Sequence, residues 1–137
     1  MSRIIILLGF SLFFIACAKK APQEKPEMYK NSELAVMMRA MLEEHKGLKA
    51  SIEKGELPES YPSTYAGITE AEATPNMDVG EPFKAFASTY FDDMDSLTAS
   101  KHVNIKQNHN RVVKSCVTCH EQHCTGPIPT IEKLYID

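Results

Sequence analysis

Three residues near the end of this 137-residue chain, Cys116, Cys119 and His120, have the types and spacing of a covalent cofactor site. In the segment Cys-Val-Thr-Cys-His, two thiols three positions apart would lie on one face of a helical turn. From there they can form thioethers to the two vinyl groups of a haem, and the imidazole can bind its iron. C-x-x-C-H is the attachment signature of c-type haem, so we expect one covalent haem c with His120 as the proximal iron ligand.

Two other chemistries use the same residue types. A zinc or iron–sulfur site could use Cys116, Cys119, His120, His123 and Cys124. Zinc sites usually take two ligand pairs from separate segments, whereas these five residues lie within one short stretch. A thiol–disulfide enzyme with C-x-x-C usually shows a strand–helix pattern, which this sequence lacks. Haem attachment is therefore favoured. No nucleophile–base pair is evident, so we expect that the protein is not an enzyme.

The first 16 residues have the pattern of an export signal. Arg3 precedes an apolar run, Ile4–Ile15, that is shorter than the roughly 20 residues a membrane-spanning helix needs. Ala16-Cys17 resembles a bacterial lipobox, although Phe14 replaces the usual leucine. We expect Cys17 to be lipidated and to anchor the protein in a membrane of the cell envelope. The alternative is ordinary cleavage, which leaves Cys17 in a tail; both interpretations place the protein outside the cytosol, in the periplasm or envelope.

Composition limits the class of partner. Without residues 1–16, the chain has 121 residues, enough for one domain, and 14 basic residues against 18 acidic ones. This acidic balance, with no basic cluster, excludes nucleic acid as an expected partner and leaves redox proteins and the membrane. Residues 17–31 are charged and contain two prolines, which predicts a lipid anchor followed by a flexible tether. Residues 32–137 would form the haem-binding domain.

The first long helix is predicted over about residues 32–54. Its apolar stripe has helical spacing and consists of Leu34, Met38, Met41, His45, Leu48 and Ile52. Ser32 is the expected N-cap, and Gly55 marks the end of the helix.

Two more long helices are predicted over about residues 81–99 and 102–122, the latter with Ser100 as a candidate N-cap. A short irregular helix is expected around residues 62–72. After the attachment motif, glycine and prolines end the last helix, and apolar residues within 128–136 predict a C-terminal strap that packs on the helices.

No segment shows sustained period-two alternation, so the predicted fold is all-α. The late position of the attachment motif, after about three helices, resembles class II c-type cytochromes, the cytochrome c′ and c-556 family. The residues that carry the resemblance are Glu33-Leu-Ala-Val-Met-Met-Arg-Ala-Met41 and Cys116–His120, and it covers about residues 31–136. The segment Gly126-Pro-Ile-Pro129 resembles a closer group, short exported c-type cytochromes of the same bundle type. The family resemblance implies an up-down four-helix bundle with haem c between the first and last helices.

This sequence departs from the family beside the proximal histidine. Cytochromes c′ usually carry an aromatic residue and an arginine three and four positions after it, where this chain has His123 and Cys124. The chemistry attributed to that arginine, including gas exchange on the proximal face, is therefore not carried over. Some relatives pair into dimers, so a homodimer stays open.

The sixth iron ligand decides between two functions. If the first and last helices are antiparallel, only the first turns of helix one reach His120, because the rise is 1.5 Å per residue. Met38 is the favoured distal ligand, with Met41 and Met37 as alternatives, although methionines at helical spacing often serve only as core. Methionine ligation predicts single-electron transfer. Without a ligand, for example with Leu34 at this position, a five-coordinate haem would bind nitric oxide or carbon monoxide.

Other polar residues receive weaker predictions. His45 is expected to be a hydrogen-bonded core or haem-edge residue, His102 and His109 to lie on the surface, and His123 to meet solvent or a propionate. Cys124, the cysteine left without a partner, is expected to be buried. Three cations, Arg39, Arg111 and Lys114, could neutralise propionates or simply face solvent.

Overall fold

The computed structural model describes residues 31–58, 60 and 63–137. The predicted signal (1–16), the lipidation site Cys17 and all but the last residue of the tether lie outside the described residues. The described part contains the helices α1 (Glu33–Glu53), η1 (Ser63–Thr69, 3-10), α2 (Glu81–Thr98), α3 (Ile105–His123), α4 (Ile128–Ile131) and η2 (Glu132–Leu134, 3-10). It contains no strand, so the all-α prediction is confirmed.

Local capping interactions determine where α1 begins and ends. The Ser32 hydroxyl accepts a hydrogen bond from the Ala35 N–H at 3.2 Å, as predicted for an N-cap. At the other end, Gly55 has a φ of +85°, and its N–H donates to the carbonyl of Ile52. Glycine tolerates this left-handed conformation, which stops the helix.

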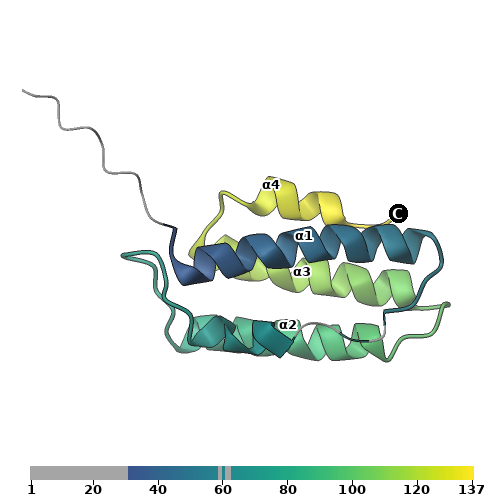
Figure 1. Cartoon of the computed structure of the whole chain (residues 1–137), viewed down its shortest axis with the longest axis horizontal. Helices are drawn as coiled ribbons and strands as arrows, with labels where there is room; N and C mark the ends of the chain where they lie inside the picture. Colours follow the sequence, from purple (N-terminus) through teal and green to yellow (C-terminus); the bar gives the residue numbers. More distant parts are fainter. Residues whose placement is uncertain (1–30, 59, 61–62) are drawn as a thin grey trace, which may run out of the picture.

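Two of the three long helices run in one direction, and the third runs in the opposite direction. In Figure 1, α1 and α2 run the same way and α3 runs back between them. The start of α1 and the end of α3 therefore lie at the same end of the molecule, where α2 also begins. Pro82 stands in the first turn of α2, a position that needs no N–H donor.

The turn between α2 and α3 differs from the prediction. Asn104, not Ser100, precedes the first turn of α3. The Ser100 hydroxyl instead donates to the Ser96 carbonyl at 2.9 Å and accepts from the Asn108 amide at 2.7 Å. These bonds hold Ser100 in the turn, and it does not cap α3 because that helix begins only at Ile105.

A hydrophobic core fills the space between the long helices. Its most buried members are Leu34, Phe83, Leu97, Val112 and Val113, and Tyr65 and Ile68 of η1 close one side. Complete burial of each large apolar side chain stabilises the fold by about 1.5–3 kcal/mol.

The C-terminal segment, which we call the strap, has contacts with α1 and α3. Ile131 and Leu134 are buried against Val113 and Val117. Asn110 of α3 holds the end of the strap through two hydrogen bonds with the backbone of Ile136, at 2.7 and 2.9 Å. Figure 1 shows α4 lying alongside α1.

Candidate haem-attachment site

His120 lies in the last turn of α3, and one hydrogen bond determines its tautomer. The Nδ1 atom is 2.9 Å from the carbonyl oxygen of Cys124. A carbonyl oxygen can only accept, so Nδ1 is the donor, and in the neutral tautomer with this proton Nε2 has the free lone pair. Histidines that bind metals are usually oriented by a bond of this kind. His120 therefore has the arrangement of an Nε2 ligand.

The end of α3 produces this bond. Cys124 leaves the helix with φ −162° and ψ 90°, while its N–H still bonds the carbonyl of His120 at 3.0 Å. The extended backbone turns the Cys124 carbonyl back towards the imidazole. Gly126 and Pro127 follow immediately and direct the chain into the strap.

The two thiols of the motif lie on the same helix, one turn apart, and both are partly exposed. Burial raises the pKa of the Cys116 thiol to about 12, and burial also raises the pKa of Cys119. Thiol–disulfide enzymes depend on a thiolate with a lowered pKa. The direction of both shifts therefore opposes that alternative.

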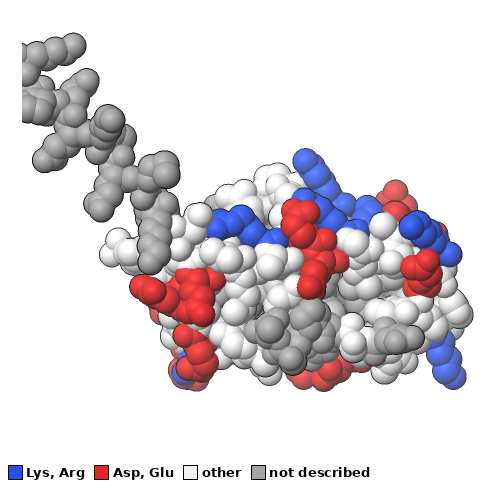
Figure 2. Space-filling view, viewed as in Figure 1, with Lys and Arg blue, Asp and Glu red and all other residues white. Residues whose placement is uncertain are grey.

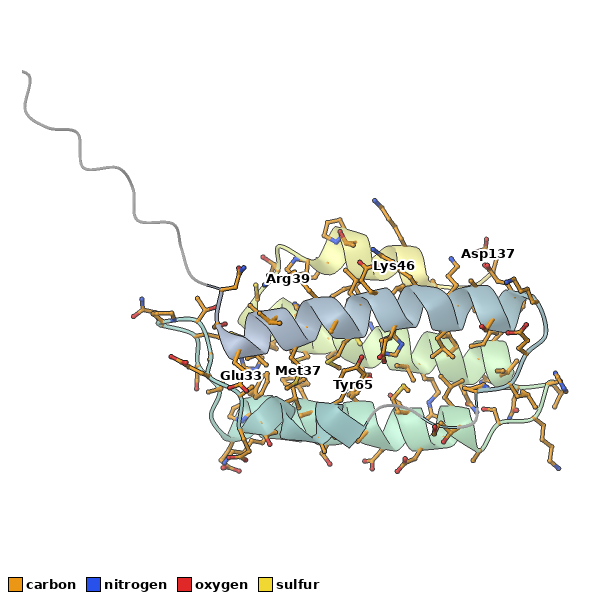
Figure 3. All side chains as sticks on the ribbon, in the orientation of Figure 1. Glu33, Met37, Arg39, Lys46, Tyr65 and Asp137 are labelled. Carbon is orange, nitrogen blue, oxygen red and sulfur yellow. The ribbon has the colours of Figure 1, made fainter. Side chains whose placement is uncertain are left out.

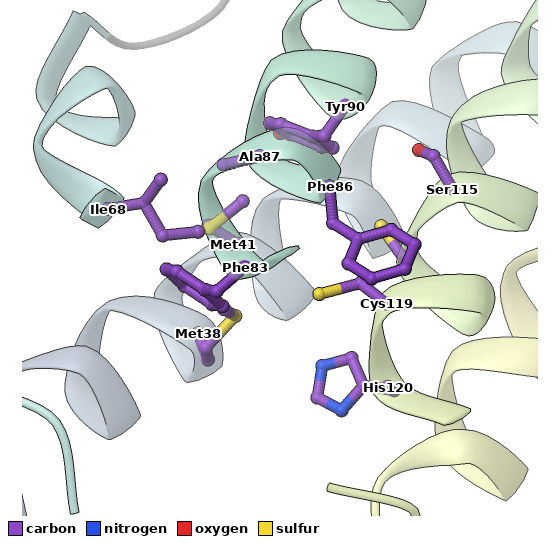
Figure 4. A pocket seen from close by; sticks show the side chains of 11 residues that line it. Met38, Met41, Ile68, Phe83, Phe86, Ala87, Tyr90, Ser115, Cys119 and His120 are labelled. Carbon is purple, nitrogen blue, oxygen red and sulfur yellow. The ribbon is translucent and has the colours of Figure 1, made fainter. Parts of the chain in front are cut away.

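Three cavities meet at His120. The inner cavity lies between α1, η1, α2 and α3 (Figure 4), and its walls are mainly apolar and aromatic. It is lined by Met38, Met41, Ile68, Phe83, Phe86, Ala87, Tyr90, Ser115, Cys116, Cys119 and His120. Both thiols and the imidazole thus border one apolar space.

The outer cavity, of about 300 Å³, lies at the end of the molecule where α1 begins. It is bordered by the first turns of α1, the loop before α2, the end of α3 and the start of the strap. Most of its lining is apolar, but Ser32, Arg39 and Thr74 add polar groups. The Ser32 and Thr74 hydroxyls are hydrogen-bonded to each other at 3.1 Å. A third, smaller space beneath the strap is lined by Leu42, Ile131 and Leu134 together with His120.

The cavities separate the three candidate methionines. Met38 borders all three cavities together with His120, and Met41 borders two. Met37 borders none of these three cavities; its terminal methyl lies 4.0 Å from where a Cβ at Gly67 would stand. Figure 3 shows Met37 on the side of α1 that faces η1 and α2. Leu34 is core and borders only the outer cavity. Of the candidate distal ligands, Met38 shares the most of these cavities with His120.

The other histidines follow the predictions only in part. His45 is buried, and its Nε2 lies 3.0 Å from the Tyr90 hydroxyl, as predicted for a hydrogen-bonded core residue. His102 is exposed as predicted. The prediction that His109 lies on the surface was wrong: it is fully buried, and neither ring nitrogen has a hydrogen-bond partner among the described residues.

His123 was predicted to meet solvent or a propionate. Its ring instead packs edge-on against Phe83 and Phe86, with centroid distances of 5.6 and 5.8 Å. Its Nε2 is buried and has no hydrogen-bond partner in the described part of the chain. His123 as a whole is half-buried, so contact of the rest of its ring with solvent is not contradicted, and contact with a propionate stays a prediction.

The structure also tests the predictions for Cys124 and for the three cations. The prediction that Cys124 is buried was wrong, because α3 ends one residue earlier and leaves it exposed. Arg111 donates to the Asp93 carboxylate at 2.8 Å, and Lys114 is exposed. Arg39 alone of the three borders a cavity at His120.

Sequence reasoning missed two features. The aromatic wall of the inner cavity comes from Phe83, Phe86 and Tyr90, whose helical spacing predicts a buried face of α2 but not a cavity wall. The buried carboxylate of Asp93 was not noticed at all; it sits beside Met94 on the inner stripe of α2. Its position next to this stripe could have indicated that Asp93 is buried. Its pairing with Arg111 could not be foreseen, because it depends on how α2 packs on α3.

Within residues 31–58, 60 and 63–137, no group of three His, Cys, Asp or Glu side chains is arranged to hold a metal ion. The zinc interpretation therefore gains no support from the structure.

Among the described residues, no helix is both long and apolar enough to cross a bilayer. Acidic and basic side chains are interspersed on the face shown in Figure 2.

Comparison with protein-family models, with curated proteins and with solved structures found no match to this chain.

Proposed function

We propose that this protein is an exported, lipid-anchored monohaem c-type cytochrome that transfers single electrons in the cell envelope and is not an enzyme. The observation that carries the proposal is the hydrogen bond from His120 Nδ1 to the Cys124 carbonyl. It leaves Nε2 as a ligand nitrogen on a residue that borders the same cavity as the two motif thiols.

The residues present fit a covalent haem. Cys116 and Cys119 would hold it through thioethers, His120 would be the proximal ligand, and the apolar walls suit a porphyrin. When bound, haem would supply an iron that changes between ferric and ferrous by one electron. The finer architecture we propose is an up-down bundle in which haem c lies between α1 and α3, closed by the strap.

Met38 is the proposed distal ligand, because it borders each cavity that His120 borders. A thioether ligand favours the reduced state and fills the sixth position. The side chains of Phe83, Phe86 and Ile68 would exclude water from this region. Arg39, with Ser32 and Thr74, is positioned to neutralise or bind acidic groups at the outer cavity.

The membrane anchor and the partners are proposed from the sequence and not from the structure of the site. Lipidation of Cys17 would hold the protein at a membrane, and other redox proteins would be its electron donors and acceptors, with no role for nucleic acid. Pairing into a homodimer is a further possibility that the resemblance alone implies.

Matched methionine variants test the distal ligand. Met38→Ala should convert a low-spin absorption spectrum to a high-spin one, while Met37→Ala, next to it but facing η1, should leave the spectrum unchanged. Carbon monoxide should then bind the Met38→Ala protein and not the Met37→Ala protein. An unchanged spectrum for Met38→Ala would refute the assignment of Met38 as distal ligand. If the unmutated protein is already high-spin, the result would favour the five-coordinate, gas-binding alternative.

A further inference from the structure

The strap, residues 128–136, adjoins one of the two motif thiols. Cys116 packs against the apolar cluster that includes Ile131 and Leu134 of the strap. The same three residues border the small cavity beneath the strap. Cys119, one turn further along α3, borders the inner cavity but not the cavity beneath the strap. The strap therefore lies against Cys116, and these contacts do not extend to Cys119.

The spaces beside Cys116 are small. The inner cavity has a volume of about 40 Å³ and the cavity beneath the strap about 50 Å³, and both are bordered by Cys116. Sites that enclose drug-sized molecules have volumes of about 300 Å³ or more. The outer cavity is larger, but neither motif thiol is among the described residues that line it. A porphyrin can therefore reach Cys116 only after part of the fold has moved.

The strap can move with less disturbance than the long helices. Thr125 and Gly126, which join it to α3, are exposed, and the space around Gly126 is open. Its release exposes three buried apolar side chains, Ile131, Leu134 and Ile136. Moving α2 would instead disrupt the most extensive helix pairing in the described chain, that of α2 with α3. Segments with few buried contacts open locally at a lower cost in free energy than the core does.

Hydrogen bonds from two long helices hold the strap in place. Asn110 of α3 makes two bonds with the backbone of Ile136, at 2.7 and 2.9 Å. Lys49 of α1 donates to the carbonyls of Lys133 and Tyr135, at 3.0 and 2.7 Å. The four bonds join the strap to the helices on both sides of the cavity beneath it. Breaking them is therefore required for the strap to leave both helices.

We propose that the strap is a lid that opens locally to admit a porphyrin to Cys116, while α2 and α3 stay packed, and that Asn110 and Lys49 hold it shut. The purpose of the opening rests on the proposed function, but the opening itself does not depend on haem. Attachment adds the S–H bond of Cys116 across a vinyl double bond, so it consumes no oxidant or reductant.

The rate at which a bulky maleimide labels Cys116 measures this opening in the full-length chain prepared without haem. The chain has four cysteines. Cys17→Ser, Cys119→Ser and Cys124→Ser together leave Cys116 as the only thiol. A companion chain keeps Cys119 and has Cys116→Ser instead.

Two asparagines on α3 offer a matched pair of variants. Asn110→Ala removes the two bonds to the strap. Asn108→Ala also removes two bonds from a half-buried asparagine, but these are donated to the turn between α2 and α3, at 3.1 and 2.7 Å. A second pair is Lys49→Met, which removes the bonds from α1, and Lys46→Met, whose exposed ammonium contacts only Glu43 among the printed ion pairs.

Asn110→Ala should raise the labelling rate of Cys116 about tenfold, because the loss of two hydrogen bonds increases the open population. Lys49→Met should raise it about threefold, since this side chain is partly exposed and water replaces part of each bond. Asn108→Ala and Lys46→Met should change the rate by less than about twofold, because the bonds that they remove do not hold the strap.

Equal acceleration by Asn110→Ala and Asn108→Ala would show that Cys116 is reached by global unfolding and would overturn the proposal. An unchanged rate in Asn110→Ala, or the same acceleration for Cys119, would overturn it as well. Circular dichroism melts check that each variant is folded; if Asn110→Ala does not fold, Lys49→Met against Lys46→Met decides. Labelling needs no haem, so its result is independent of the absorption spectrum that tests the proposed function.

Discussion

Acid should destabilise this protein through a buried histidine, and the size of the effect follows from the structure. His45 is 5% exposed and lies in the core beside Tyr90. Burial, with the nearby His109 as a smaller cause, lowers the pKa of His45 from 6.5 to about 4. The folded protein thus holds His45 neutral at pH values where the unfolded chain would protonate it.

The sign and magnitude follow from this difference. Below pH 6.5 the unfolded state takes up a proton that the folded state takes up only near pH 4, so stability is lost as the pH falls through this window. From pH 7 to pH 4.5 the loss from His45 alone is about 2 kcal/mol. Burial also lowers the pKa of His109, which adds a loss in the same direction.

Urea unfolding at several pH values would isolate this effect. His45→Gln keeps a side chain able to bond the Tyr90 hydroxyl but removes the titration, and His102→Gln, at an exposed position, is the control. The stability difference between unmutated protein and His45→Gln should shift by about 2 kcal/mol between pH 7 and pH 4.5. Parallel stability curves for the two proteins would refute the reasoning.

Three further predictions concern attachment, the strap and the anchor. Cys116→Ser should weaken covalent attachment, and fully retained haem stain on a denaturing gel would contradict the thioether assigned to Cys116. Asn110→Ala removes both bonds to Ile136 and should destabilise the fold by about 1–3 kcal/mol in urea unfolding; Asn31→Ala, at an exposed position before α1, should change stability by less than about 0.5 kcal/mol. Cys17→Ser should move the protein from the membrane fraction to the soluble fraction, and unchanged fractionation would argue against lipidation.

Much of the fold could be predicted because its signals are local. The Ser32 cap, the stop at Gly55 and the apolar stripe of α1 each depend on residues within a few positions of one another. The attachment motif is likewise contiguous, so its place at the end of α3 followed from the helical pattern.

Two predictions about burial were wrong. One depended on which face of α3 packs inward, and the other on the residue at which α3 ends. His109 was predicted to lie on the surface, yet it follows Ile105 by four positions and precedes Val112 by three, which places it on the buried face. Cys124 was predicted to be buried, but α3 ends at His123 and Cys124 is exposed just beyond it.

Long-range polar pairs could not be predicted from the sequence. The bond between His45 and Tyr90 and that between Asp93 and Arg111 join side chains on different helices. Which residues meet there depends on the rotation and axial position of each helix in the packed fold. The bond from His120 Nδ1 to the Cys124 carbonyl, in contrast, is local but needs the extended backbone at the helix end, which composition does not reveal.

The central claim is tested most directly by the ultraviolet–visible spectrum of the purified protein, oxidised and reduced, with and without carbon monoxide. A six-coordinate electron-transfer haem predicts a sharp reduced α-band, a weak far-red methionine-to-iron band in the oxidised protein, and no shift with carbon monoxide. A broad high-spin spectrum that shifts with carbon monoxide would contradict ligation by Met38. The absence of any haem absorption would contradict the account as a whole.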